Sequence, residues 1–171
     1  DKDKYQVVPC DTNKLKLLCP TLSSYLKSRN LFDRWARTAF IKLPPRGNHL
    51  PHIDNPNMPD RTWAMNIPIK NCEESYTMFY STTPKIMAKK RNNNIHGDIV
   101  KKFDFYPDEI TEIGKVKTDT PYYCNVSVIH SGRNTTDKER LLLSLRFEPD
   151  IEDIVYDHHN RTSQKENQAA S

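Results

Sequence analysis

The stretch Pro51–Arg61 reads Pro-His-Ile-Asp-Asn-Pro-Asn-Met-Pro-Asp-Arg and places His52 and Asp54 two positions apart. Side chains two positions apart on an extended strand point to the same face of a sheet. An imidazole nitrogen and a carboxylate oxygen on one face can bind the same metal ion. The stretch therefore predicts a short strand that carries two metal ligands.

A third ligand is available in Val126-Ser-Val-Ile-His-Ser-Gly, where His130 is expected at the end of a second strand, 76 residues after Asp54. A lone histidine on a strand is usually an ordinary polar side chain, but the combination with His-x-Asp is more specific. Two histidines and one carboxylate form the facial triad that binds Fe(II) and leaves positions open for a substrate and dioxygen. We therefore predict His52, Asp54 and His130 as iron ligands and catalytic residues.

The composition describes one polar globular domain. The chain has 171 residues, of which 36% are hydrophobic and 28% charged, and its net charge of +4 permits an acidic partner without requiring one. No apolar run approaches the roughly 20 residues of a membrane helix, and the first residues do not resemble a signal peptide. The four cysteines show no paired spacing. We expect reduced thiols, a cytoplasmic location and no membrane partner.

The chain divides into regions with different hydrophobic patterns. Residues 1–36 predict helix, because Leu22, Leu26 and Trp35 belong to an apolar series at helical spacing. Residues 37–150 contain short apolar runs between clusters of Pro, Asn and Asp, which indicate strands at 39–43, 62–69, 76–81, 110–116, 122–130 and 140–147. Such a series fits a mainly β jelly roll, with the N-terminal helices packed on a sheet. Residues 151–171 form a polar tail that we expect to fray.

The expected strand Arg140–Phe147 has two different faces. Alternation places four apolar side chains on one face, and Arg140, Leu142, Ser144 and Arg146 on the other. An unpaired buried guanidinium is costly, so the arginine face is either exposed to solvent or lines a pocket that holds an anion. The planar guanidinium fork suits a carboxylate. By the same alternation Asn66 lies on the polar face of the strand at 62–69, where it faces either a cavity or water.

Residues 85–102 carry six Lys and Arg side chains against Asp98 alone, together with three consecutive asparagines. We expect a basic inserted loop at the surface. The alternative interpretation is a basic lid over an anionic substrate or nucleic acid, of which nucleic acid is the less favoured partner.

The set of His52, Asp54, His130 and Arg140 resembles the signature of the Fe(II)/2-oxoglutarate-dependent oxygenases. Within that superfamily, His-x-Asp-Asn-Pro-Asn followed by Arg61 is similar to the prolyl hydroxylases. The ten-residue spacing from His130 to Arg140 is similar to the aspartyl/asparaginyl β-hydroxylases, although those lack the carboxylate that Asp54 provides.

One position departs from the prolyl hydroxylase pattern. Those enzymes carry a tyrosine that binds the co-substrate on the strand after the position of Arg61, where this chain has Pro68. Tyr76 or Tyr80, on the next expected strand, is the candidate replacement.

The resemblance implies a double-stranded β-helix of cupin type that binds Fe(II), O2 and the co-substrate 2-oxoglutarate. The distal carboxylate of 2-oxoglutarate would meet Arg140, with Asn66, Ser144 and Arg146 as further residues that bind it. The implied reaction is hydroxylation of a C–H bond in a peptidyl residue, an amino acid or another small substrate, with release of succinate and CO2.

Two other interpretations stay open at the level of sequence. The first is a cupin-like metal isomerase or dioxygenase that does not use 2-oxoglutarate, in which Arg140 would have no evident purpose. The second is a catalytically silent jelly-roll module, either metal-binding or a viral structural protein.

Overall fold

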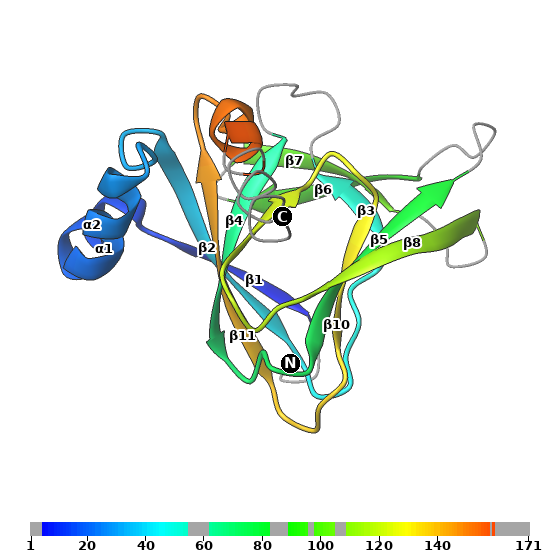
Figure 1. Ribbon diagram of the computed structural model, residues 1–171. Helices are drawn as coiled ribbons and strands as arrows, with labels where there is room; N and C mark the ends of the chain where they lie inside the picture. The colour runs from blue at the N-terminus through cyan, green and yellow to red at the C-terminus, as the bar shows by residue number, and fades with distance from the viewer. Residues whose placement is uncertain are drawn as a thin grey trace, which may run out of the picture.

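The computed structural model describes residues 5–54, 62–82, 89–95, 98–104, 109–157 and 159, and these residues build two antiparallel sheets (Figure 1). The five-stranded sheet has the order β1(Gln6–Cys10)-β2(Trp35–Leu43)-β11(Arg140–Phe147)-β4(Trp63–Lys70)-β9(Tyr122–Asn125). The six-stranded sheet has the order β6(Lys89–Ile95)-β7(Asp98–Asp104)-β3(His52–Asp54)-β10(His130–Asn134)-β5(Ser75–Thr82)-β8(Ile110–Lys117). This architecture confirms the predicted mainly β, cupin-like jelly roll.

Two short helices, α1(Thr12–Leu18) and α2(Pro20–Ser28), lie against the five-stranded sheet (Figure 1). Asp11 caps α1 by accepting a hydrogen bond from the Lys14 amide at 3.0 Å. The core beneath the helices contains Leu26, Leu31, Trp35, Met65, Leu143, Leu145, Phe147 and Ile151. Apart from Leu31 and Ile151, which lie between elements, these side chains come from α2, β2, β4 and β11. The predicted packing of N-terminal helices on a sheet is therefore confirmed.

The prediction that residues 1–36 are helical throughout was wrong at both ends. Gln6–Cys10 forms β1, which pairs with β2 at the edge of the sheet, and Pro9 is tolerated there because an edge strand does not need every amide donor. Trp35 begins β2 instead of ending a helix. Its indole is buried and donates a hydrogen bond to the Thr38 hydroxyl at 2.8 Å, which fixes it in the core.

The expected strand at 122–130 is two strands in two different sheets. Asn125 ends β9, because its side-chain oxygen accepts hydrogen bonds from the Ser127 amide at 3.0 Å and the Ser127 hydroxyl at 2.6 Å. The chain then crosses to the six-stranded sheet, where His130 begins β10. His130 is therefore the first residue of a strand. The sequence had suggested that it is the last residue of one.

Two segments that were expected to be irregular contain regular structure. Within the basic segment, β6 and β7 pair as an antiparallel hairpin, and β7 pairs in turn with β3. The segment therefore extends the sheet, while residues 85–88 and 96–97 lie outside the described residues. In the tail, Ile151 is fully buried and residues 152–157 are helical. The rest of the tail, apart from residue 159, is also outside the described residues.

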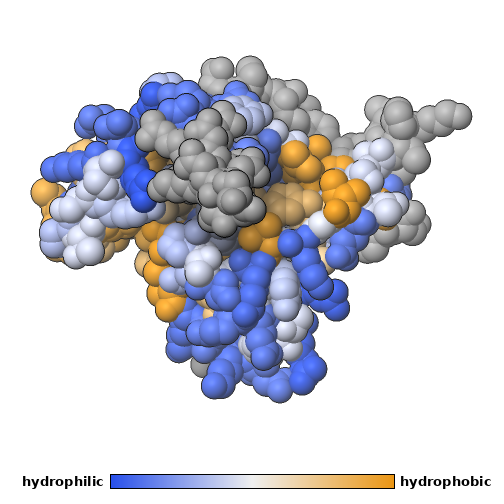
Figure 2. All heavy atoms as spheres, in the orientation of Figure 1, coloured by the Kyte–Doolittle hydropathy of each residue, from blue (hydrophilic) through white to orange (hydrophobic). Residues whose placement is uncertain are grey.

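The surface of the described residues is mainly polar. Figure 2 shows hydrophilic side chains over much of the visible face, with smaller hydrophobic groups among them. The most exposed large apolar side chains are Leu17 and Leu18 on α1, Ile113 on β8, and Tyr156. Such scattered residues are ordinary on protein surfaces. No helix in the described part of the chain is long and apolar enough to cross a membrane.

We predict that Trp35→Ala lowers the free energy of unfolding by about 3–5 kcal/mol, because it empties the centre of the core that joins the helices to the sheet. Urea denaturation measures the change. Leu17→Ala is the matched control, since Leu17 is 82% exposed, and we expect a change below about 0.5 kcal/mol. A similar stability for the two variants would contradict the assignment of this core.

Candidate metal centre

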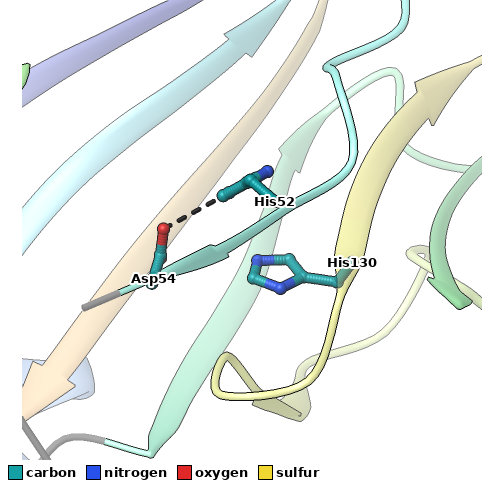
Figure 3. A group of neighbouring side chains, drawn as sticks. All are labelled: His52, Asp54 and His130. Carbon is teal, nitrogen blue, oxygen red and sulfur yellow. Dashed lines mark ion pairs between the residues drawn. The ribbon is translucent and has the colours of Figure 1, made fainter. Parts of the chain in front are cut away.

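The neighbouring strands β3 and β10 of the six-stranded sheet bring His52, Asp54 and His130 together (Figure 3). His52 and His130 are register partners in the antiparallel pair, and Asp54 follows on the same face of β3. One potential ligand atom from each residue lies within 4.8 Å of the other two. The structure thus assembles the three residues that the sequence singled out, although their role as metal ligands stays a prediction.

Both imidazole rings are held by the backbone in the orientation that a metal ligand needs. Nδ1 of His52 lies 2.9 Å from the Leu50 carbonyl oxygen, and Nδ1 of His130 lies 2.8 Å from that of Val128. A carbonyl oxygen can only accept, so each Nδ1 carries the proton and donates it. In the neutral ring with its proton on Nδ1, Nε2 carries the lone pair, as in histidines that bind metal.

His130 is electrically neutral at ordinary pH. Burial away from water, with a smaller contribution from the neighbouring His52, lowers the pKa of His130 to about 3. The ring centroids of the two histidines lie only 4.4 Å apart, so two positive charges there would repel strongly. Because a metal ion binds the neutral imidazole, His130 does not have to lose a proton before it binds a metal ion.

Arg146 holds the carboxylate of Asp54. Its Nη2 donates to Oδ2 of Asp54 at 2.6 Å, while Oδ1 of Asp54 lies 3.3 Å from Nε2 of His52 (dashed line in Figure 3). The carboxylate therefore turns one oxygen to the arginine and the other to the histidines. Arg146, which was predicted to bind a co-substrate, lies next to the metal ligands instead of at a distance from them.

A cavity of about 150 Å³ lies between the two sheets and includes the three candidate ligands in its wall. Arg140 lies in the same wall and is only 2% exposed. Burial lowers the pKa of its guanidinium, and its Nε and Nη1 atoms have no hydrogen-bond acceptor among the described residues. A buried cation with two unused donors is costly, so a hydrogen-bond acceptor at this point would stabilise the protein.

Close approach of Arg140 to β10 depends on Gly132. A Cβ atom at position 132 would lie 3.2 Å from Nη2 of Arg140 and 3.0 Å from a methyl carbon of Leu43. Glycine therefore allows the guanidinium to lie over β10, two residues from His130. This proximity brings the guanidinium of Arg140 close to the candidate metal centre.

Further polar side chains surround Arg140. The Tyr122 hydroxyl lies 2.7 Å from that of Thr77 and accepts a hydrogen bond from the Asn66 amide nitrogen at 3.2 Å. Burial raises the pKa of Tyr122 to about 12, so its hydroxyl remains a neutral donor. Oδ1 of Asn66 and Oγ of Ser144 are buried without a hydrogen-bond partner among the described residues. Asn66 and Ser144 thus face the cavity, which is one of the two alternatives that the sequence left open for each.

The two tyrosines that the sequence suggested for binding the co-substrate, Tyr76 and Tyr80, lie outside the cavity wall. The Tyr80 hydroxyl is within 3.0 Å of that of Ser131, and the Tyr76 ring lies under the Lys115 ammonium, so neither belongs to the cavity wall. One tyrosine that does lie in the described cavity wall is Tyr122. Its position follows from the register of β9 with β4, in which Tyr122 is the partner of Asn66. Strand register cannot be read from one sequence, so no local signal identifies Tyr122.

Two aromatic side chains were also missed. Tyr5 stacks on His49 with ring centroids 3.8 Å apart, and His49 meets His52 edge-on at 4.1 Å. Both line the cavity beside the histidine pair. Tyr5 comes from the chain just before β1, the strand that the sequence did not indicate. Arg61 and the Asn-Pro-Asn sequence before it lie outside the described residues, as do the side chains of the basic segment.

The comparisons support the fold. No protein-family model and no curated protein matches this chain. The X-ray structure of E. coli ycfD matches with a TM-score of 0.50 and 14% identity over 95% of this chain and 38% of that one. Oxalate oxidase in complex with the substrate analogue glycolate gives a TM-score of 0.43 and 12% identity over 88% of this chain and 55% of that one.

A cupin domain from Bordetella pertussis gives a TM-score of 0.35 and 12% identity, over 66% of this chain and 80% of that domain. The chain thus spans about half the length of the oxalate oxidase and less than half of ycfD. The protein has a cupin-like jelly-roll fold that contains a His-Asp-His cluster able to hold a metal ion.

The donor set fits such an ion. Two imidazoles and one carboxylate converge in the wall of a cavity. We predict that His130→Ala weakens Fe(II) binding at least a hundredfold in anaerobic calorimetric titration, because it removes one of three ligands.

His159→Ala is the matched control for that titration. His159 is an exposed histidine outside the cavity wall, and its replacement should leave the affinity unchanged. Stoichiometric iron retained by His130→Ala would exclude His130 as a ligand.

The lowered pKa of His130 also predicts how the stability of the metal-free protein depends on pH. An unfolded chain protonates this histidine below about pH 6.5, whereas the folded protein does not until about pH 3. Stability should therefore fall as the pH drops below 6.5, by up to about 1.4 kcal/mol per pH unit from this group.

Urea denaturation at pH 7.5 and 5.5 tests the contribution of His130. Other groups titrate equally in the parent protein and in His130→Gln, so the comparison isolates this histidine. The parent should lose more stability than the variant between the two pH values. Equal losses would show that His130 is not buried in the neutral form.

Proposed function

We propose that this protein is an Fe(II)- and 2-oxoglutarate-dependent dioxygenase that hydroxylates a C–H bond of a small-molecule or peptide substrate. The observation that carries the proposal is the buried guanidinium of Arg140, which has two donors unused among the described residues and lies in the same cavity as the His-Asp-His cluster. A metal site alone would not require a buried cation nearby. A co-substrate with an anionic group at each end requires both a metal ion and a buried cation.

The distance between the two ends supports a five-carbon dicarboxylate. Arg140 lies against Gly132, and Gly132 is two residues from His130 on β10, which corresponds to about 7 Å along the strand. A 2-oxoglutarate molecule can reach from the metal centre to the guanidinium over such a distance. A shorter anion such as oxalate could occupy only one end.

The donors around Arg140 suit a carboxylate. The guanidinium offers a planar fork, and the Tyr122 hydroxyl and the Ser144 hydroxyl line the same cavity. Tyr122 is held by Thr77 and Asn66, so its position is set before the ligand arrives. These groups would bind and orient the distal carboxylate, and Asn66 would act mainly by positioning Tyr122.

Fe(II) is the metal that two histidines and one carboxylate with open positions favour. When bound with O2 and 2-oxoglutarate, it supplies oxidation of a substrate C–H bond with release of succinate and CO2. The chain itself contributes the ligand geometry, the charge match at Arg140, and an apolar wall. That wall includes Val7, Ile41 and Leu142, which keep water away from the bound co-substrate.

We predict that Arg140→Ala weakens 2-oxoglutarate binding ten- to a hundredfold, because each charge-assisted hydrogen bond is worth roughly 1.5–3 kcal/mol. The measurement is titration of the anaerobic Fe(II) protein with 2-oxoglutarate, followed by the weak visible absorption of the chelate. Arg140→Lys should recover only part of the affinity, since an ammonium group cannot form the bidentate fork.

Two controls make this experiment decisive. Iron affinity without 2-oxoglutarate should be the same in Arg140→Ala and in the parent, because Arg140 is not a ligand. Arg46→Ala, which removes an exposed guanidinium paired with Asp137, should change neither affinity. No chelate band in the parent protein would refute the proposed function, and unchanged 2-oxoglutarate affinity in Arg140→Ala would move the role to another residue.

A further inference from the structure

Cys124 is a buried thiol that the proposed reaction does not use. It lies on β9, is only 1% exposed, and belongs to the wall of the cavity that contains the His-Asp-His cluster. It is a free cysteine, as the sequence predicted. Thiols are among the side chains that oxidise most readily. The position of Cys124 relative to the metal centre therefore decides whether oxidation there can reach it.

Strand register places Cys124 in line with Arg146. Arg146 of β11 is the partner of Ala64 on β4, and Ala64 is in turn the partner of Cys124 on β9. Directly opposed residues of antiparallel strands project from the same face of a sheet. The three residues therefore form one row on the cavity side of the five-stranded sheet. Its middle member is the small side chain of Ala64, so no bulky group of the row separates the thiol from the guanidinium.

Both ends of this row contact Asp54, one of the candidate metal ligands. Arg146 donates a hydrogen bond to the Asp54 carboxylate at 2.6 Å. The carbonyl oxygen of Val126, two residues after Cys124, accepts a hydrogen bond from the Asp54 amide at 3.0 Å. Val126 and Cys124 also pack with Ala64 in one buried cluster. Cys124 thus lies beside the metal-binding strand, at the end of the cavity that contains the candidate metal centre.

The environment of Cys124 protects it from oxidants in solution. Burial raises the pKa of its thiol to about 12, while the charge of Arg146 lowers this pKa and that of Asp54 raises it. An ordinary thiol, with a pKa near 8.5, carries roughly a thousandfold more thiolate at neutral pH. The thiolate is the form that reacts with dissolved oxidants. Oxidation of Cys124 would therefore have to begin inside the cavity.

Polar atoms beside the row indicate that a ligand comes close to Cys124. Oδ1 of Asn66 and Oγ of Ser144 have no hydrogen-bond partner among the described residues, and both residues are more than nine-tenths buried. Asn66 is two residues from Ala64 on β4, and Ser144 is two residues from Arg146 on β11, so both lie next to the row and face the same cavity. A co-substrate that satisfies these atoms would therefore bind next to the thiol.

We propose that Cys124 is a modification site, where the protein oxidises its own thiol to a sulfenic acid when 2-oxoglutarate is consumed without substrate. The inference rests on the proposed function, because it uses the same co-substrate and O2. One oxygen atom of O2 bonds to Sγ and converts S–H into S–O–H, while the other enters succinate as 2-oxoglutarate loses CO2. The thiol and 2-oxoglutarate each give up two electrons, which together reduce one O2.

The modification should persist long enough to be detected. A sulfenic acid is usually lost by condensation with a nearby thiol. No other cysteine belongs to the described wall of the cavity, so the oxidised Cys124 has no such partner there. Burial also keeps dissolved thiols away from it.

The test uses the full chain with Fe(II), 2-oxoglutarate and oxygen-18 gas, without substrate. The protein is then denatured and labelled with 7-chloro-4-nitrobenzofurazan, which retains the sulfenic oxygen, and its cysteine peptides are weighed by mass spectrometry. The peptide of Cys124 should gain one oxygen-18 atom in proportion to the succinate formed.

Cys72 is the matched internal control. It is also buried, at 3% exposed, but it lies outside the cavity wall, and its thiol donates hydrogen bonds to the carbonyl oxygens of Lys70 and Leu141. Cys124 should gain at least about tenfold more oxygen-18 than Cys72, since cysteine oxidation is selective for the site.

Two measurements without turnover test the position and the protection of Cys124. In the anaerobic Mn(II)-loaded protein, the paramagnetic ion should broaden the carbon-13 Cβ resonance of Cys124 more than that of Cys72. In the Zn(II)-loaded protein, whose metal has no redox chemistry, hydrogen peroxide should oxidise Cys124 more slowly than the partly exposed Cys19. Equal broadening of Cys124 and Cys72, or faster reaction of Cys124 with peroxide, would contradict the inference.

The inference and the proposed function fail in different measurements. Succinate formed without oxygen-18 at Cys124 would overturn the modification site and leave the dioxygenase proposal standing. Equal oxygen-18 in Cys124 and Cys72, or oxidation of Cys124 without 2-oxoglutarate, would overturn it as well. No succinate in any preparation would refute the proposed function and, with it, the oxidation of Cys124.

Discussion

The structure depends on the two-residue alternation of β11, which lies between β2 and β4 in the five-stranded sheet. One face of this strand contributes Leu143 and Leu145 to the core beneath the helices, and the other contributes Arg140, Ser144 and Arg146 to the cavity. A one-residue slip in register would exchange the two faces. It would then place guanidinium groups in the core, so the hydrophobic core that stabilises the fold also fixes the position of the polar site.

The cavity is costly to keep in a folded protein. Arg140, Asn66 and Ser144 all present buried polar atoms that have no hydrogen-bond partner among the described residues, and each such atom costs on the order of 1–3 kcal/mol. The cores on either side of the cavity offset this cost. A ligand that satisfies these atoms binds only the folded state and therefore stabilises it. These unsatisfied polar atoms are concentrated in the cavity beside the candidate metal centre, as is usual for functional sites.

The sequence was informative wherever alternation alone decides which way a side chain points. It located β11 at Arg140–Phe147 and β4 to within one residue, and it placed Asn66 and Ser144 on faces that line either a cavity or solvent, of which the structure shows the cavity. It did not indicate β1, whose five residues include a proline, or the crossing after Asn125. Cys124 and Tyr122 were missed for a different reason. Their place in the cavity follows from pairing with β4, and pairing partners far apart in sequence leave no local signal.

The same register relates the parts of the proposed reaction to one another. β10 carries His130 and, two residues later, the glycine that lets Arg140 approach, so the metal centre and the carboxylate site are set by one strand. β11 carries both Arg140 and Arg146, and Arg146 donates a hydrogen bond to Asp54 beside the candidate metal centre. Because both strands are paired on either side, neither spacing can change without breaking a sheet. Rigid strands, and not loops, therefore hold every group that the proposed chemistry requires, as precise positioning demands.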